Sequence, residues 1–250
     1  MKKSKKLLIA LGMVVAAVAI AAGSIAGTVA YMTSASKVSN VFTIGNVKIH
    51  MDEGKVDAEG KLLTDEAAAR TDSNSYLLMP GKSYDKDPII TVQADTQACY
   101  LFMVTRNQIS SIEDPSKPTM AQQMVANGWG IYKDTSAGSR VWIYCGSSAN
   151  VNAETMHAIT PVTICGESVT ATGATKVTTI PVFTKFHITT TESDNLAIYA
   201  GAEVTLNAVG IQADSFVTDE NGNAVDKAWA AVVAQFPYIQ DNLGGNQNNG

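Results

Sequence analysis

The residues that most often carry out protein chemistry are few in this chain and widely spaced. The three histidines, His50, His157 and His187, stand alone in strand-like runs, and none has a second histidine four residues away. A helix-borne zinc protease site needs two histidines at that spacing, with a glutamate beside the first. The sequence therefore encodes no such site. A zinc site assembled across the fold stays open, and imidazoles at strand edges or on the surface are the simpler interpretation.

Motifs for a nucleophile or a phosphate-binding loop are also absent from the sequence. The sequence contains no G-x-S-x-G element, no Walker A motif and no G-x-G-x-x-G fingerprint. No stretch combines a nucleophile, a general base and an oxyanion site. We therefore expect a protein without enzymatic activity and without a cofactor, whose role is structural or one of binding.

Two further groups of side chains could bind a ligand. The carboxylates of Asp85 and Asp87 in "SYDKDP" (83–88) could supply oxygen ligands to a cation. A solvated turn that leads into a strand is the simpler interpretation, because Lys86 separates the acids and Pro88 follows them. Four aromatic residues could stack on a sugar or a base, but both phases of their strands are apolar, so we predict core packing. These four are Tyr100, Phe102, Trp142 and Tyr144.

The cysteines indicate packing rather than a disulfide framework. There are three of them, which is too few for such a framework, and an odd number cannot pair completely within one chain. Cys99, Cys145 and Cys165 lie in strand-like apolar runs, where a cysteine commonly acts as a small buried hydrophobic residue. One disulfide among them is compatible with the sequence but is not predicted.

The N-terminus has the layout of an export signal. Four lysines precede an apolar stretch from Leu7 to about Ala30, and small residues stand at its end. We predict that residues 1–30 are a signal peptide, cleaved between Ala30 and Tyr31. The mature protein would then be secreted into the extracellular matrix or to the cell surface, with membrane contact only before cleavage. An uncleaved membrane anchor is the alternative, because about 20 apolar residues can span a bilayer.

Composition places the remainder of the chain among globular proteins. Of the 250 residues, 46% are hydrophobic and 16% are charged. These values suit one domain of roughly 200 residues with a substantial core. Removal of residues 1–30 takes away four lysines and no acidic residue, so the formal charge changes from -5 to -9. Such an acidic chain is not expected to bind nucleic acid.

Short β-branched and aromatic segments alternate with turn residues, which predicts an all-β fold: a β-sandwich with short helical insertions. The predicted strands are residues 38–51, 88–94, 98–106, 140–146, 158–165, 177–191 and 203–213. The predicted helices are residues 62–72, 120–127 and 224–236. The resulting organisation is a signal peptide (1–30), an N-terminal strand segment (31–49), a sandwich domain (50–240) and a disordered polar tail (241–250).

The first strand segment after the signal contains a change of phase. Phe42 and Ile44 share one side of an extended chain, whereas Val47 and the next apolar residues have the opposite phase. An extra residue at a glycine reverses the pleat and produces a bulge or a sharp bend. We therefore predict two β pieces on either side of a kink at Gly45, which can belong to different sheets.

Several motifs occur in the order found in a known family of exported proteins. The clearest is "GTVAYMTSASKVSNVFTIGNVKIHMDE" (27–53), with a Gly-Thr-x-Ala-Tyr junction followed by an N-x-F-T-x-G-N-V element. Further pieces are "LMPGKSYDKDPIITVQADTQACYLFM" (78–103), "GWGIYKD" with "VWIYC", "IPVFTKFHI" (180–188) and "AVGIQAD" (208–214). In these motifs the chain resembles the TasA/camelysin family of Gram-positive bacteria, which a SipW-type signal peptidase usually processes.

This resemblance implies a jelly-roll-like β-sandwich that assembles into the fibres of an extracellular biofilm matrix. In such fibres the N-terminal segment of one subunit completes the sheet of its neighbour, by donor-strand exchange. The partners would be further copies of the chain, together with accessory anchoring or matrix proteins. A donated strand satisfies the backbone groups of an open edge, and head-to-tail donation propagates as a filament. The residues assigned to the donated segment are Val38, Val41, Phe42, Ile44, Gly45, Asn46 and Val47.

Other functions and another role for the first strand stay open at this stage. The family name camelysin carries a metallopeptidase label, so a cell-surface metallopeptidase is one alternative. A monomeric surface adhesin is another. The first strand itself could be an ordinary intramolecular strand, which a subunit keeps for its own sheet.

Overall fold

The structure is a computed structural model in which β-strands predominate. It describes residues 39–64, 69–134, 139–146, 178–190, 196, 198–199, 201–220 and 222–241. Several sequence predictions lie outside these residues: the signal peptide with its Ala30–Tyr31 cleavage site, Val38, His157, the 158–165 strand, Cys165 and the end of the polar tail. Among the described residues, no helix has the length and apolar character needed to cross a membrane.

The larger sheet has five strands in the order β1-β11-β6-β8-β7. Their bounds are Ser39–Ile44 (β1), Val204–Gln212 (β11), Cys99–Asn107 (β6), Ser139–Tyr144 (β8) and Trp129–Asp134 (β7). Neighbouring strands are antiparallel except at one edge, where β1 runs parallel to β11. A hairpin cannot connect a parallel pair, so β1 reaches this edge from a distant part of the sequence.

A second sheet has four antiparallel strands in the order β3-β2-β5-β9, and a separate two-stranded ladder pairs β10 with β4. Their bounds are Arg70–Thr71 (β3), Ile49–Gly54 (β2), Ile89–Val92 (β5), Thr178–Pro181 (β9), Lys185–His187 (β10) and Ser83–Asp85 (β4). The helices are Met120–Ala126 (α2), Ala224–Gln235 (α3) and Pro237–Asp241 (α4), with a 3-10 turn at Ser110–Ile112.

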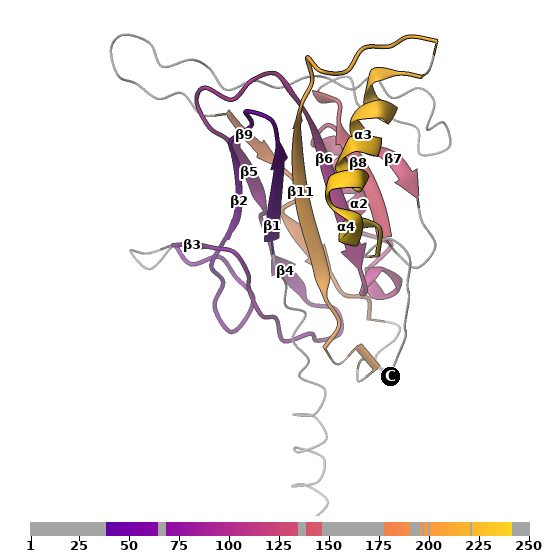
Figure 1. Cartoon of the computed structure of the whole chain (residues 1–250). Helices are drawn as coiled ribbons and strands as arrows, with labels where there is room; N and C mark the ends of the chain where they lie inside the picture. The colour runs from indigo at the N-terminus through magenta and orange to yellow at the C-terminus, as the bar shows by residue number, and fades with distance from the viewer. Residues whose placement is uncertain are drawn as a thin grey trace, which may run out of the picture.

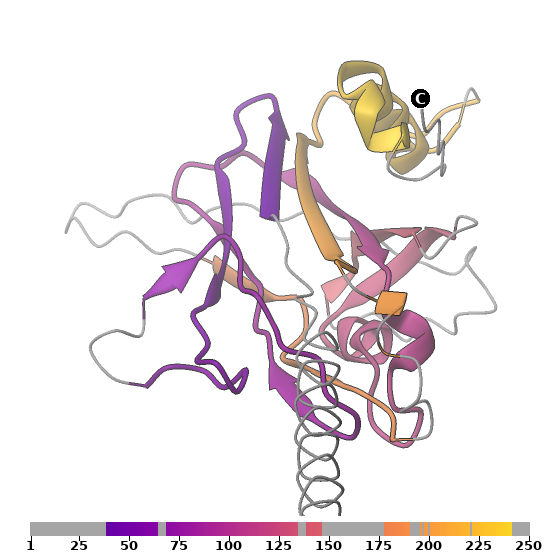
Figure 2. The same cartoon turned by 90° about the horizontal axis from the view of Figure 1, so that it is seen from below.

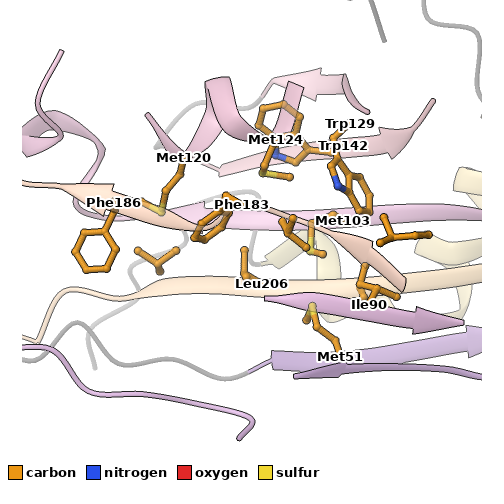
Figure 3. Packing of buried hydrophobic residues seen from close by; sticks show 14 of the residues in the cluster. Met51, Ile90, Met103, Met120, Met124, Trp129, Trp142, Phe183, Phe186 and Leu206 are labelled. Atoms are coloured by element: carbon orange, nitrogen blue, oxygen red, sulfur yellow. The ribbon is translucent and has the colours of Figure 1, made fainter. Parts of the chain in front are cut away.

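The main core lies between the two larger sheets. Met103, Trp142 and Leu206 of the five-stranded sheet and Met51 and Ile90 of the four-stranded sheet belong to one buried cluster (Figure 3). Helix α2 contributes two buried methionines to the same cluster. The two sheets thus bury their facing surfaces against each other, with α2 at one side.

The opposite face of the five-stranded sheet is buried as well, because α3 and α4 cover it (Figures 1 and 2). Phe102, Val141 and Val209 of the sheet pack with Trp229 and Val232 of α3. Central strands buried on both faces carry apolar residues in both phases. The prediction of core packing from that pattern is confirmed for Phe102 and Trp142, which are buried, whereas Tyr100 and Tyr144 are half-buried.

Two of the three predicted helices are confirmed. The segment 120–127 forms α2, which begins with a capping box between Thr119 and Gln122 and ends before Gly128, at a φ of 92°. The segment 224–236 forms α3, whose N-cap Asn223 side chain accepts a hydrogen bond from the backbone of the first turn. In both cases the local capping signal and the apolar periodicity agree.

The predicted helix at 62–72 is wrong at both of its described ends. Leu62 forms a bridge with Val56, and Arg70 lies in β3, which pairs with β2. The Arg70 guanidinium binds the carboxylates of Asp52 and Asp87. Tertiary contacts of this kind outweigh the helix propensity of an alanine-rich segment, which amounts to only a few tenths of a kcal/mol per residue.

Candidate functional site

The predicted assembly segment forms the edge of the five-stranded sheet. Strand β1 pairs with β11 along its whole length, from Ser39 beside Leu206 to Ile44 beside Ile211. No strand of the described chain pairs with its other side. Both views show β1 next to β11, with the helices on one outer face of the sheet (Figures 1 and 2). β1 therefore covers backbone groups of β11 that would otherwise form an open edge.

The side chains of β1 reach both cores. Val41 packs against the core between the sheets, whereas Phe42 and Ile44 pack against the core under α3. All three are only half-buried. The Phe42 ring lies 5.2 Å from the ring of Phe236 and 5.4 Å from that of Tyr238, measured between centroids. Removal of β1 would consequently expose apolar surface on both faces of β11.

A polar pair fixes the register of β1 on β11. The Asn40 Nδ2 atom donates a hydrogen bond of 3.1 Å to the Oδ1 atom of Asn207, a residue that is only 5% exposed. A shift of β1 by one residue would separate these amides and would move Phe42 and Ile44 to the other face of the sheet. The edge of β11 therefore accepts one register and one sequence pattern.

The chain turns sharply after β1, as the phase change predicts. Gly45 has a φ of 80°, and a Cβ atom at this position would lie 2.6 Å from the Oε1 atom of Gln212. That Oε1 atom accepts a hydrogen bond of 2.9 Å from the backbone N–H of Asn46. The prediction of two β pieces that belong to different sheets is confirmed, because β1 lies in the five-stranded sheet and β2 in the four-stranded one.

Val47 is held more firmly than β1. Its side chain is 5% exposed and lies directly over Gly210 of β11, where an added Cβ atom would come within 2.6 Å of Val47 Cγ1. The flanking backbone is anchored to the loop after β5, since Asn46 O accepts a hydrogen bond of 3.0 Å from Gln97 N. The seven assigned residues thus separate into a half-buried edge strand and an anchored start of the next strand, with Val38 outside the described residues.

The histidines that the structure describes do not come together. His50 Nε2 lies 3.2 Å from Asp52 Oδ2 at an exposed position, and His187 Nδ1 lies 2.6 Å from Ser83 Oγ. Burial, with help from the nearby Lys117 charge, lowers the pKa of His187. Within the described ranges, no three histidine, cysteine, aspartate or glutamate side chains are arranged to hold a metal ion.

The "SYDKDP" segment is not the solvated turn that the sequence suggested. Its first half is strand β4, and Asp85 and Lys86 are buried. Burial opposes ionisation of Asp85, but the hydrogen bond from Lys185 Nζ, at 2.6 Å, holds the pKa of this carboxyl below its usual value. Asp87 accepts a hydrogen bond of 2.6 Å from Gly54 N and pairs with an arginine. Protein cations and N–H groups therefore occupy both carboxylates that could have held a cation.

Two cysteines lie in different cores, as expected of small hydrophobic residues. Cys99 belongs to the core between the sheets, and Cys145, a free thiol, to the core under α3. Burial raises the pKa of Cys145 to about 11, so this thiol resists conversion to the reactive thiolate.

The strongest candidate site is therefore β1 with the β11 edge on which it lies. It consists of three apolar side chains, one amide pair and a glycine turn. The chain matches no model of a protein family, no well-characterised protein and no solved structure.

Proposed function

We propose that the protein is a secreted structural subunit that polymerises into extracellular matrix fibres by donor-strand exchange. The single observation that carries this proposal is the placement of β1, an edge strand that runs parallel to β11 and contacts both cores. In a fibre, β1 of one copy would occupy the same edge of β11 in the next copy.

The exchange needs no new interface, because the donated strand would make the contacts that β1 makes within one chain. Burying an apolar side chain of this size completely contributes about 1.5–3 kcal/mol, and the side chains of Val41, Phe42 and Ile44 are half-buried. The swapped and unswapped states therefore have similar contact energies, and protein concentration decides between them. This equivalence is the reason that strand swapping is a low-cost route to assembly.

The turn at Gly45 and Asn46 is a suitable hinge for the exchange. Both residues are exposed, and two hydrogen bonds of the Asn46 backbone hold the turn: its N–H donates to the Gln212 side chain, and its O accepts from Gln97 N. If the turn opens, β1 leaves the subunit while Val47 keeps its place over Gly210. The opened subunit then has a strand to donate and an empty β11 edge, and such a heterologous contact extends into a filament when it does not close.

We further infer that the two sheets are connected in a jelly-roll-like manner. The support is that the chain crosses repeatedly between them: among the described strands, β1 and β2, β5 and β6, and β8 and β9 are consecutive pairs in which one strand belongs to each sheet. Crossing connections of this kind are usual in sandwiches with Greek-key or jelly-roll topology.

Electron microscopy of the purified mature chain, with and without a synthetic peptide of residues 31–49, tests the proposal. We expect the chain alone to form fibres and the peptide to shorten them by occupying the β11 edge of terminal subunits. The matched control is the same peptide with Phe42→Asp and Ile44→Asp, which should leave fibre length unchanged. Monodisperse particles in place of fibres, or equal fibre lengths with both peptides, would contradict the proposal.

A further inference from the structure

A buried amine, a buried carboxylate and a buried amide meet at the end of strand β2, away from the β1 edge. Glu53 of β2 is 0% exposed, Lys86 just after β4 is 3% exposed, and Asn74 in the loop after β3 is 8% exposed. Lys86 Nζ donates a hydrogen bond to Glu53 Oε2, and Asn74 Nδ2 donates one of 3.1 Å to Glu53 Oε1. A single carboxylate thus holds the amine on one oxygen and the amide on the other.

The amide of Asn74 is held in one orientation. Its Oδ1 atom accepts a hydrogen bond of 3.1 Å from Val56 N, and its Nδ2 atom donates a second hydrogen bond, of 2.8 Å, to Gly54 O. Oxygen and nitrogen of the side chain are therefore both committed to the backbone around β2. The nitrogen of the amide faces Glu53, the group that could supply it with a proton.

One ring of a buried aromatic cluster lies beside the ion pair. Lys86 Nζ lies 5.8 Å from the ring centre of Tyr76. Tyr76, Tyr84 and Phe186 form a buried cluster with ring centroids 4.9 to 5.8 Å apart. An apolar site of this kind makes a separated charge pair costly.

We propose that this site joins Lys86 to Asn74 through an amide bond, with Glu53 as the group that transfers protons. A proton moves from Lys86 Nζ to Glu53, and the amine lone pair attacks Asn74 Cγ. As the new bond between Nζ and Cγ forms, the bond between Cγ and Nδ2 breaks. Nζ gives up two of its three protons and keeps one hydrogen in the new amide. One of the two passes through Glu53 to Nδ2, which leaves as ammonia, and the other stays on Glu53 until the departing ammonia carries it away as ammonium. No oxidation or reduction occurs, and no co-reactant is required.

An amide reacts slowly with an amine in solution. Holding the Lys86 amine and the Asn74 amide against one carboxylate would compensate for this low reactivity. Intramolecular groups held in reacting orientation reach effective concentrations on the order of 10⁵–10⁸ M. The product would link the loop after β3 to the end of β4, beside β2. β2 is the strand that follows the turn at Gly45, so it is the first part of the subunit body to receive force from β1. The proposal stands independently of fibre formation, because the three groups meet within one chain.

The intact mass of the purified, unfolded full chain tests the proposal. We expect it to be lower than the sequence mass by one ammonia, once any N-terminal processing is assigned by tandem mass spectrometry. The same fragmentation should show peptides containing Asn74 and Lys86 joined as one branched species. Lys86→Arg and Glu53→Gln should each leave the chain at its full sequence mass, because the first removes the attacking amine and the second removes the carboxylate that transfers the protons. The matched control Lys185→Arg removes an amine that pairs with Asp85 and should retain the link.

Three outcomes overturn the proposal. The first is a wild-type chain of full sequence mass with unlinked peptides. The second is a loss of water instead of ammonia, which would place the bond on the Glu53 carboxyl. The third is an ammonia loss that maps to another residue. Because each is read from the wild-type chain, the test remains decisive even where Lys86→Arg or Glu53→Gln does not fold.

Discussion

Replacement of Phe42 and Ile44 by aspartate should abolish fibre growth while the domain remains folded. Both side chains are half-buried against the core under α3, and the Phe42 ring contacts the aromatic rings of Phe236 and Tyr238. Losing half the burial of two such side chains costs about 1.5–3 kcal/mol. Two carboxylates placed against an apolar surface add roughly 1–3 kcal/mol. A docking free energy weakened by about 4 kcal/mol lowers the equilibrium constant roughly a thousandfold.

The assay compares fibre growth by light scattering and electron microscopy with the fold by circular dichroism. The matched control is Ile198→Asp with Val217→Asp, because these side chains are 66% and 65% exposed and lose little burial. We expect the control to polymerise like the wild type and the β1 variant to remain a folded monomer. If the β1 variant unfolds as a monomer, β1 is an ordinary intramolecular strand. If it polymerises normally, the edge of β11 is not the assembly site.

Three other predictions follow from the sequence and the turn after β1. Sequencing the N-terminus of the secreted protein should give Tyr31 as the first residue, and a mature chain that keeps the apolar run would place it in the membrane-anchored class. The purified protein should cleave a peptide library equally slowly with zinc and with a chelator; chelator-sensitive cleavage that is lost on replacing a histidine would show a peptidase instead. Gly45→Ala should cost the closed turn about 1–2 kcal/mol, because of its φ of 80° and the contact with Gln212. It should therefore speed strand exchange, whereas unchanged or slower fibre growth would exclude this turn as the hinge.

The features of the fold that could be predicted from the sequence depend on residues that are close together in the chain. The slip of phase at Gly45 predicts the change of sheet between β1 and β2, because side chains alternate strictly along a strand. The apolar residues in both phases of β6 and β8 predict burial on two faces, and α3 supplies the second cover. In each case, neighbours in the sequence carry the necessary information.

The features that were missed depend on partners far apart in the chain. The parallel register of β1 on β11 joins residues separated by 167 positions, as for Asn40 and Asn207. Lys86 and Glu53 are 33 positions apart. The turn-like sequence around Lys86 therefore does not show that this charged side chain has a buried partner. The only local signal for this burial is a lysine between two aspartates, with a tyrosine just before them. It can be interpreted only when the pairing of β4 with β10 is known.

The most direct test of strand donation mixes two single variants, Asn40→Cys and Asn207→Cys. These positions are register partners, and adjacent strands lie about 4.8 Å apart, within the range that a disulfide can bridge. In fibres grown from the mixture and then oxidised, we predict disulfide-linked dimers that neither variant forms alone. Absence of such dimers, together with a bridge confined within single chains of the double variant, would contradict the donation of β1 to a neighbouring subunit.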